Sequence, residues 1–292
     1  MDRRRVAREA DRRIGAVSDI ELSDVLPRDH VQYELDGDIT FDEDGTTTGR
    51  LRPSDVQRTP SGEVPLGLVA NFADLLAGWA SLRASAPDRV ATADMTVSVL
   101  RTDRPEHLDG RVSVVRRGRR TLVSEVAIVD DRGAAAALAT VTFAVLPQPP
   151  EATPPSILPP GRHPLTRDRR RPTSSFASSA GVVVDGPGVA HVPITPRVHN
   201  ALAALNGGVL ATLLDVVVAS AGTSALGRAC TTSDIDIAYL SLGRVGPARA
   251  TATVLGAPLP RGTDRATVEV VVIDEGADDR LLTRATGLAV VV

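Results

Sequence analysis

A single carboxylate interrupts the long apolar segment LNGGVLATLLDVVVASAG, residues 205–222. A helix that is apolar on every side is normally buried, and an unpaired buried carboxylate such as Asp215 costs several kcal/mol. Gly207 and Gly208 open the segment, where a helix N-terminus leaves free N–H groups and a positive dipole end. Glycines let a ligand approach those groups closely. This combination is suited to acyl transfer, with the amides stabilising an oxyanion and the carboxylate acting as general base or nucleophile.

Further polar residues flank the segment. Asn200 and Asn206 precede the glycines, and an Asn side chain can orient a water molecule or a leaving group. Ala211, Asp215 and Ala219 fall on one i, i+4 row of the helix, which gives a small, polar stripe. We therefore expect one face of this helix to line a cleft.

The same arrangement occurs once more, nearer the N-terminus. The segment GLVANFADLLAG aligns without gaps with GVLATLLDVVVA and pairs Asp74 with Asp215. The runs TADMTVSVL, from Thr92, and TSDIDIAYL, from Thr232, also match in the same order. Such self-similarity indicates a tandem repeat. Two acids at equivalent positions favour a functional role over the alternative, in which each Asp only bonds backbone or an Arg between the halves.

Each half therefore contains an extended segment, a loop, one long apolar helix and a series of strands. The strand candidates are rich in Val, Thr and Ala, and turn-like pieces such as DDRG and EGADD separate them. They are Thr92–Arg101, Gly110–Arg117, Leu122–Asp130, Ala135–Leu146, Thr232–Leu240, Ala248–Leu255, Ala266–Asp274 and Leu281–Val292. Short connections favour antiparallel neighbours. We predict an α+β fold in which an antiparallel sheet wraps around each helix.

Four segments follow from this division. We expect an N-terminal helical extension over residues 1–24, a first domain over 25–148 and a second domain over 177–292. Between the domains, residues 149–176 are rich in proline, which excludes regular helix and central strand and favours an extended linker.

The segment HNALAALNGGVLATLLD resembles the hotdog-fold acyl-CoA thioesterases of the phenylacetyl-CoA thioesterase type. Their pattern is an Asn, a His-Gly-Gly six residues later, and an acidic residue nine positions after that His. Here Asn200 matches the Asn, Asn206 takes the His position, and Gly207 and Gly208 match the glycines. Asp215 matches the acid.

This resemblance implies two tandem hotdog folds that form a pseudo-dimer within one chain, across one continuous sheet. In many members the active site straddles the pair, with the loop supplied by one domain and the acid by the other. Carried over to this chain, one site combines Asn200, Asn206 and Gly207 with Asp74 and Thr92.

The other implied site combines Asp215 and Thr232 with the first-half loop at Pro65 and Leu66. These two residues replace the Asn and the first Gly of the second-half loop. Proline has no N–H to donate, and leucine carries a side chain where close approach is required. We therefore expect an impaired loop here and one working site per chain.

The remaining candidates concern the substrate. Gly208 and Ser233 are candidates for contacting it, and Arg228, just past the second helix, is a candidate for the coenzyme A phosphates. The resemblance implies an acyl-CoA or acyl-carrier-protein thioester as substrate, with no cofactor besides the coenzyme A that the substrate carries. The histidines show no metal-like spacing. Association of the chains into a homodimer or homotrimer is also expected.

Composition argues against several other classes of protein. A net charge of −3 and an aromatic content of 2% give no support to a nucleic-acid partner. The single cysteine, Cys230, excludes an internal disulfide framework and a Cys-based zinc site. We expect no signal peptide and no membrane span of roughly 18–20 apolar residues, and hence a cytoplasmic protein.

Two alternatives to thioester hydrolysis remain open. A non-catalytic acyl-binding protein is consistent with an Asn in the His position and with the altered first-half loop. A hotdog hydratase or dehydratase relies on an Asp and a His close together on the helix and its loop, and no His follows Asp74 or Asp215 there.

Overall fold

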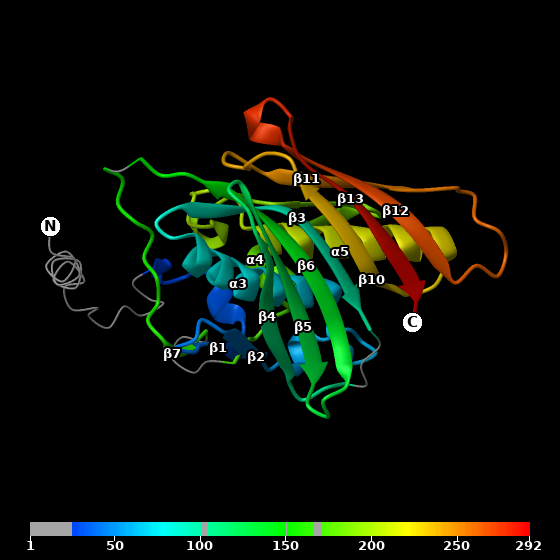
Figure 1. Ribbon diagram of the computed structural model, residues 1–292. Helices are drawn as coiled ribbons and strands as arrows, with labels where there is room; N and C mark the ends of the chain where they lie inside the picture. The colour runs from blue at the N-terminus through cyan, green and yellow to red at the C-terminus, as the bar shows by residue number, and fades with distance from the viewer. Residues whose placement is uncertain (1–24, 101–103, 150, 166–170) are drawn as a thin grey trace, which may run out of the picture.

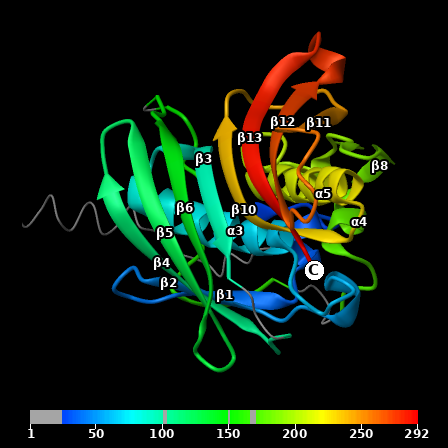
Figure 2. The same ribbon diagram turned by 90° about the vertical axis from the view of Figure 1, so that its right-hand side faces the viewer.

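The fold is seen in a computed structural model that describes residues 25–100, 104–149, 151–165 and 171–292. The helical extension expected over residues 1–24 lies outside the described residues. Two long helices dominate the described chain, α3 (Leu66–Ser85) and α5 (Gly207–Leu226), and both are buried along most of their length. They pack against each other on the concave side of one large sheet (Figures 1 and 2).

The ends of the two helices follow from local sequence. The side chain of Asn206 caps the N-terminus of α5, and Gly227, in the left-handed conformation with φ 66°, ends it. Helix α3 begins after Pro65, which offers no side-chain cap, and ends at Ala86, where Pro87 follows. The apolar helices predicted from the repeat are thus both present.

All strands in the described residues belong to one antiparallel sheet. The first half contributes β1 (Gly37–Phe41), β2 (Thr47–Leu51), β3 (Arg89–Val99), β4 (Leu108–Arg117), β5 (Thr121–Asp130), β6 (Ala135–Leu146) and β7 (Gly161–Pro164). The second half contributes β8 (Val183–Gly186), β9 (Val189–Val192), β10 (Cys230–Tyr239), β11 (Ala248–Val254), β12 (Arg265–Asp274) and β13 (Arg280–Val291). A short helix, α4 (Phe176–Ala180), and four 3-10 turns complete the described elements: Val31–Glu34, Asp55–Gln57, Pro196–Val198 and Glu275–Ala277.

The strand order displays the repeat directly. It runs β7-β1-β2-β4-β5-β6-β3-β10-β13-β12-β11-β9-β8, so the same sequence of strands extends outward on both sides of the central β3–β10 pair. Among the described strands, only β7 has no counterpart. In the central pair Thr96 lies opposite Asp236, and Asp94 lies opposite Ala238. The prediction of an antiparallel sheet wrapped around each helix is confirmed, with the two halves fused into one sheet.

The short strands at the sheet edges are what the sequence patterns did not resolve. Strand β7 lies within residues 149–176, expected to be an extended linker, and pairs with β1 at the outer edge. Proline is tolerated at such an edge because no further strand requires its N–H. The linker is therefore partly recruited into the sheet, at a position that its prolines allow.

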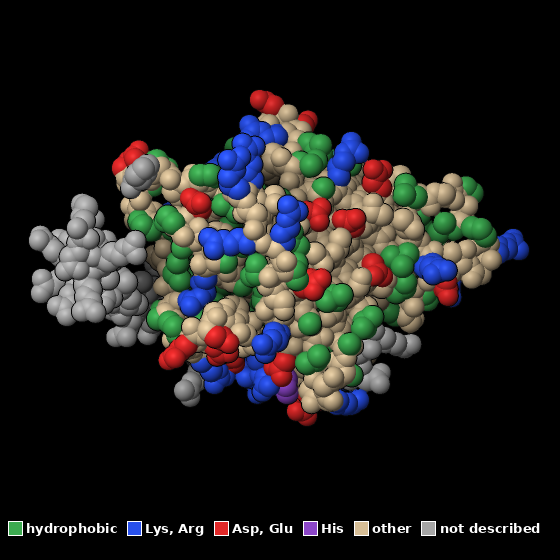
Figure 3. Space-filling model, in the orientation of Figure 1, with side chains coloured by type: hydrophobic (Ala, Val, Ile, Leu, Met, Phe, Trp, Pro, Cys, Tyr) green, Lys and Arg blue, Asp and Glu red, His purple; other side chains and the backbone are tan. Residues whose placement is uncertain are grey.

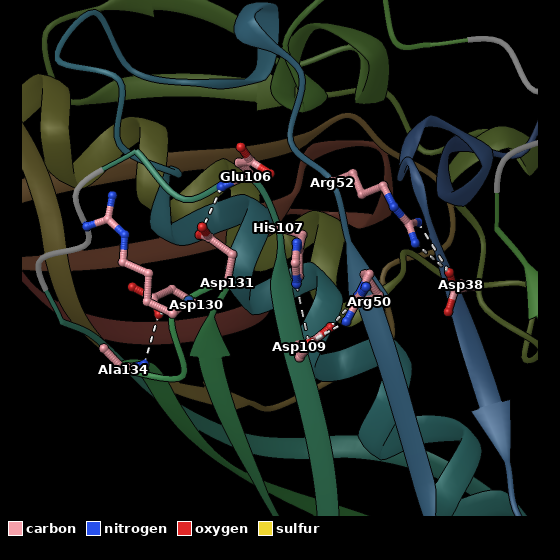
Figure 4. A network of polar contacts seen from close by, with 10 residues as sticks. Asp38, Arg50, Arg52, Glu106, His107, Asp109, Asp130, Asp131 and Ala134 are labelled. Atoms are coloured by element: carbon pink, nitrogen blue, oxygen red, sulfur yellow. Dashed lines mark hydrogen bonds and ion pairs between the residues drawn. The ribbon is translucent and has the colours of Figure 1, made fainter.

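Ion pairs reinforce the outer strands of the first half (Figure 4). Arg50 donates two hydrogen bonds, of 2.6 and 2.7 Å, to the carboxylate of Asp109 and so joins β2 to β4. Arg52 donates to Asp38 at 3.2 Å and ties the end of β2 to β1. Because these arginines are more than a third exposed, such pairs contribute modestly to stability. On the face of the molecule seen in Figure 3, basic, acidic and apolar side chains are interspersed.

Helix α5 is both long and strongly apolar. Its length and its mean hydropathy of 1.8 meet those of a membrane span, contrary to the expectation that no segment would. In the fold, however, 61% of this apolar window is buried inside the protein, with the sheet and α3 around it. The helix is therefore the core helix of the second half.

Candidate active site

Asp74 lies where the two helices cross, close to the N-terminus of α5. The backbone N–H of Gly208 donates to its Oδ2 atom at 3.0 Å, and the hydroxyl of Thr92 donates to its Oδ1 atom at 3.0 Å. The first half thus supplies the acid and the second half supplies the helix end, as the implied straddling site requires.

Asp215 makes the reciprocal contact. Its Oδ2 atom accepts a hydrogen bond of 2.9 Å from the N–H of Gly67, near the N-terminus of α3. The hydroxyl of Thr232, however, donates to the backbone carbonyl of Asp215 at 3.1 Å. Both acids therefore accept a backbone hydrogen bond at the interface between the halves, which is the alternative that the sequence left open. The two acids differ in their surroundings, because Asp74 lines a cavity and Asp215 does not.

A β-bulge presents Thr92 to Asp74. The pairing of β3 with β6 shifts register between Thr92 and Asp94, and the pairing of β10 with β13 shifts at the equivalent place, between Thr232 and Asp234. Bulges re-aim side chains and occur often beside active sites. The repeat preserves this device in both halves.

The N-terminus of α5 is built to present an amide. Asn206 Oδ1 accepts hydrogen bonds from Gly208 N–H (2.9 Å) and Val209 N–H (3.2 Å), which leaves its Nδ2 group as the donor that the side chain can offer elsewhere. The N–H of Gly207, the first of the helix, has no acceptor within the helix. The hydroxyl of Tyr239 donates to the Gly207 carbonyl at 2.9 Å and holds this corner.

Each glycine of the pair has its own steric reason. A Cβ atom at Gly207 would lie 3.0 Å from Thr92 Oγ1 and 3.2 Å from Asp74 Oδ2, so a side chain there would press on the acid. A Cβ atom at Gly208 would lie 2.7 Å from the backbone of Asn71, on α3. Gly207 therefore leaves room beside the acid, whereas Gly208 permits the close crossing of the helices.

A cavity of about 390 Å³ opens at this crossing. The five residues of the implied straddling site all line it: Asp74, Thr92, Asn200, Asn206 and Gly207. The side-chain oxygen of Asn200 accepts from the N–H groups of Leu202 (2.9 Å) and Ala204 (3.2 Å) and so shapes the loop that forms one wall.

The other predicted residues lie elsewhere. Asp215, Thr232 and Gly208 are buried between the halves and do not line this cavity. The hydroxyl of Ser233 donates to its neighbour Asp234, and Arg228 donates to the carbonyl of Thr263. The structure does not bring Ser233 or Arg228 to the cavity.

The cavity wall also contains polar residues that were not predicted from sequence, among them His199 and Arg89. His199 contributes to the wall, and its Nε2 atom is buried with no hydrogen-bond partner among the described residues. Half-buried Arg89 also lines the cavity and donates to the carbonyl of Ala201. Arg89 lies three residues before Thr92, where the predicted strand begins, so a basic residue just ahead of that strand was the available signal.

Burial decides the electrostatics of the two acids. It raises the pKa of Asp74 from 3.8 to about 6, even though the hydrogen bonds from Thr92 and Gly208 oppose this shift. Burial likewise raises the pKa of Asp215. The pKa of the Tyr239 phenol is raised by burial and by the charges of Asp74 and Asp94, which keeps it a neutral donor. A carboxylate with a pKa near neutrality is well matched to general-base chemistry.

The sequence of the second half matches a known family. Residues 202–279 match the model of the Thioesterase superfamily. This part of the chain is similar to that superfamily. This matched segment contains the N-terminus of α5, including Asn206 and Gly207. No curated protein sequence matches this chain.

Solved structures extend the likeness to both halves. A putative oleoyl thioesterase from Lactobacillus plantarum is 14% identical, with a TM-score of 0.57, and the match covers 85% of this chain and 96% of that one. The tesB protein of Mycobacterium avium subspecies paratuberculosis is 16% identical, with a TM-score of 0.57 and coverage of 83% and 92%. A hot dog fold protein from Alicyclobacillus acidocaldarius is 15% identical, with a TM-score of 0.52 and coverage of 86% and 94%. The predicted tandem hotdog fold is confirmed.

Proposed function

We propose that this protein hydrolyses acyl-CoA or acyl-carrier-protein thioesters at the cavity that Asp74 shares with the N-terminus of α5. The observation that carries the proposal is this meeting of a buried acid from one half with helix amides from the other. The thioesterase-superfamily match of the second half supports it.

In the proposed reaction Asp74 acts as general base. Its carboxylate removes a proton from a water molecule, and the water oxygen attacks the carbonyl carbon of the thioester. The N–H of Gly207 and the Nδ2 group of Asn206 stabilise the oxyanion that forms. When the C–S bond breaks, Asp74 returns the proton to the departing thiolate. The products are a carboxylic acid and a free thiol.

The protein environment prepares Asp74 for this role. The Thr92 hydroxyl and the Gly208 N–H fix both carboxylate oxygens, so the acid keeps one orientation. Asn206 occupies the position where the resembling enzymes carry His, and an amide cannot carry a proton. Both proton transfers therefore depend on Asp74. Arg89, which also lines the cavity, supplies positive charge for the phosphates of coenzyme A.

A panel of acyl-CoA thioesters with a thiol-detecting reagent tests this proposal. Asp74→Asn should lower kcat/KM by roughly 10²–10⁴-fold, the usual contribution of a general base. Asp215→Asn is the matched control, because it alters the equivalent acid outside the cavity, and it should retain most of the activity. Equal loss in both variants contradicts the proposal. Binding of acyl-CoA without thiol release would indicate an acyl-binding protein instead.

Isotope labelling separates a general base from a nucleophile. In a single turnover in ¹⁸O-water, a general base leaves the Asp74 carboxylate unlabelled and places the label in the acid product. Attack by Asp74 itself would expel the thiolate and form a mixed acyl–aspartyl anhydride. Attack of water on the Asp74 carbonyl of this anhydride would place ¹⁸O in the Asp74 carboxylate, which mass spectrometry of the Asp74 peptide detects.

A further inference from the structure

The cavity lining is chemically mixed. Asp74 and the loop before α5 contribute polar groups to it. The apolar side chains of Leu75, Trp79, Leu82, Val90 and Phe143 also line it. A thioester is mixed in the same way, because its acyl chain is apolar whereas the pantetheine and phosphates on the other side of the sulfur are polar.

Gly78 lies between Asp74 and Leu82 on α3, and all three line the cavity. It lines the cavity one helical turn beyond Asp74, and a Cβ atom placed on it would meet no heavy atom within 4 Å outside its own helix. The other glycines at the helix crossing, Gly67 and Gly208, have backbone or side-chain atoms closer than 3.0 Å to such a Cβ. Packing therefore does not require glycine at position 78, and its missing side chain leaves open space in the cavity.

The proline-rich linker forms part of the cavity wall. Residues 153–156, which include Pro154 and Pro155, line the cavity. Just beyond them, Arg83 of α3 donates a hydrogen bond of 2.6 Å to the carbonyl of buried Leu158 and fixes the linker to the helix. Proline restricts the backbone further. A segment of the cavity wall is thus tied to the helix that carries Gly78.

Charge restricts the acyl group that fits here. The charged side chains that line the described cavity are Asp74 and Arg89, and Arg89 already donates to the carbonyl of Ala201 in the loop before α5. A carboxylate at the far end of an acyl chain that lay among Trp79, Leu82 and Phe143 would be buried among apolar side chains, at a cost of several kcal/mol.

We propose that the acyl group lies over Gly78, that this position sets the longest chain the cavity accepts, and that the substrates carry neutral hydrocarbon acyl groups. This inference rests on the proposed thioesterase function. It deepens that function by naming a specificity-determining residue and a substrate class.

Chain-length profiles of Gly78 variants test the inference. We compare wild type, Gly78→Ala and Gly78→Leu on even-numbered acyl-CoAs from acetyl to dodecanoyl, and on an ω-carboxyacyl-CoA. The ratio of kcat/KM for the longest accepted chain to that for acetyl-CoA should fall by roughly tenfold to a hundredfold in Gly78→Leu, and less in Gly78→Ala. The ω-carboxyacyl substrate should be turned over far more slowly than the neutral substrate of equal length.

Ala219→Leu is the control, because Ala219 is the equivalent position on α5 and does not line the cavity. It should leave the ratio unchanged. An unchanged ratio in Gly78→Leu, or preference for the ω-carboxyacyl substrate, overturns the inference while leaving thioester hydrolysis intact. If wild type hydrolyses nothing, the proposed function fails, and calorimetric binding of non-hydrolysable thioether analogues then tests Gly78 by the same ratio. Absence of any binding overturns both.

Discussion

The two halves of the chain present the same constellation twice, and the surroundings of the two acids differ. Asp74 and Asp215 each accept a hydrogen bond from the N-terminus of the opposite helix, at 3.0 and 2.9 Å. At the N-terminus of α5, however, Asn206 and Gly207 line a cavity together with Asp74. At the N-terminus of α3, the cap is a proline without a side-chain hydrogen bond, and the next side chain, Leu66, is buried.

The acid–amide contact is therefore structural in both halves, and in the half with the cavity it is also a candidate for catalysis. The reciprocal contact locks the two helices together. Catalysis further needs a free amide, a steric gap beside the acid and a space for substrate, which Gly207 and the cavity supply. The remaining predictions probe this distinction, in order of decreasing effect.

The largest loss of activity should come from replacing Gly207, in the second-half loop, by the leucine that the first-half loop carries at the equivalent position. Gly207→Leu introduces a side chain at the place of Leu66, within contact of Asp74 and Thr92. We expect kcat/KM to fall by roughly 10²–10³-fold, as for the loss of an oxyanion donor. The reverse change, Leu66→Gly, should have little effect on activity. A gain of activity with Leu66→Gly would break the proposed division between the halves.

The pH dependence of kcat/KM should identify the acid. Because the pKa of Asp74 lies at about 6 and the base acts in its ionised form, kcat/KM should rise about tenfold per pH unit below 6 and level off above it. Wild type and Asp215→Asn should show the same profile. A flat profile between pH 5 and 7 would assign the chemistry to another group.

The free energy of unfolding should change in the same direction when either buried acid is replaced by Asn. Between pH 4 and 6 folded Asp74 retains a proton that the unfolded chain has released, so the wild type loses stability as pH rises through this window. Asp74→Asn removes that cost, and its free energy of unfolding should exceed that of wild type by up to about 3 kcal/mol at pH 7 and by almost nothing at pH 4. Asp215→Asn should shift in the same direction, since burial also raises the pKa of Asp215. Urea unfolding at both pH values measures this, and destabilisation of both variants at pH 7 would refute it.

Substitutions of Thr212 and Asn71, where the two helices cross, should change the stability of the protein by a smaller amount. Thr212 donates its hydroxyl to the carbonyls of Gly67 and Gly208, at 3.0 Å each, whereas both side-chain polar atoms of the equivalent Asn71 are buried without a partner among the described residues. Asn71→Thr should therefore stabilise the protein by about 1 kcal/mol. Thr212→Asn should destabilise it by a similar or larger amount. Thermal unfolding of the two variants gives the comparison, and opposite signs would show that Asn71 has a role of its own.

Much of this architecture could be read from sequence because both halves repeat it. The eight predicted strands correspond to β3–β6 and β10–β13, and the paired acids located the helix crossing. Asp74, Thr92, Asn206 and Gly207 were found because the motif in one half pointed to its counterpart in the other.

What the sequence could not supply depends on packing between distant segments. Gly78 and linker residues 153–156 line the same cavity although they lie far apart in sequence, and no local pattern encodes that proximity. The functions expected of Ser233 and Arg228 relied on their proximity to the second helix along the chain, whereas their side chains bond locally. The edge strands were missed because four or five residues carry too little periodicity.

The number of acyl-thioester sites per chain shows whether only the N-terminus of α5 forms a working site. Isothermal titration of the full chain with a non-hydrolysable acyl-CoA thioether should give one site per chain, and Gly207→Leu should abolish or strongly weaken that binding. Two equivalent sites per chain, or one site that survives Gly207→Leu and is lost with Leu66→Gly, would contradict the account.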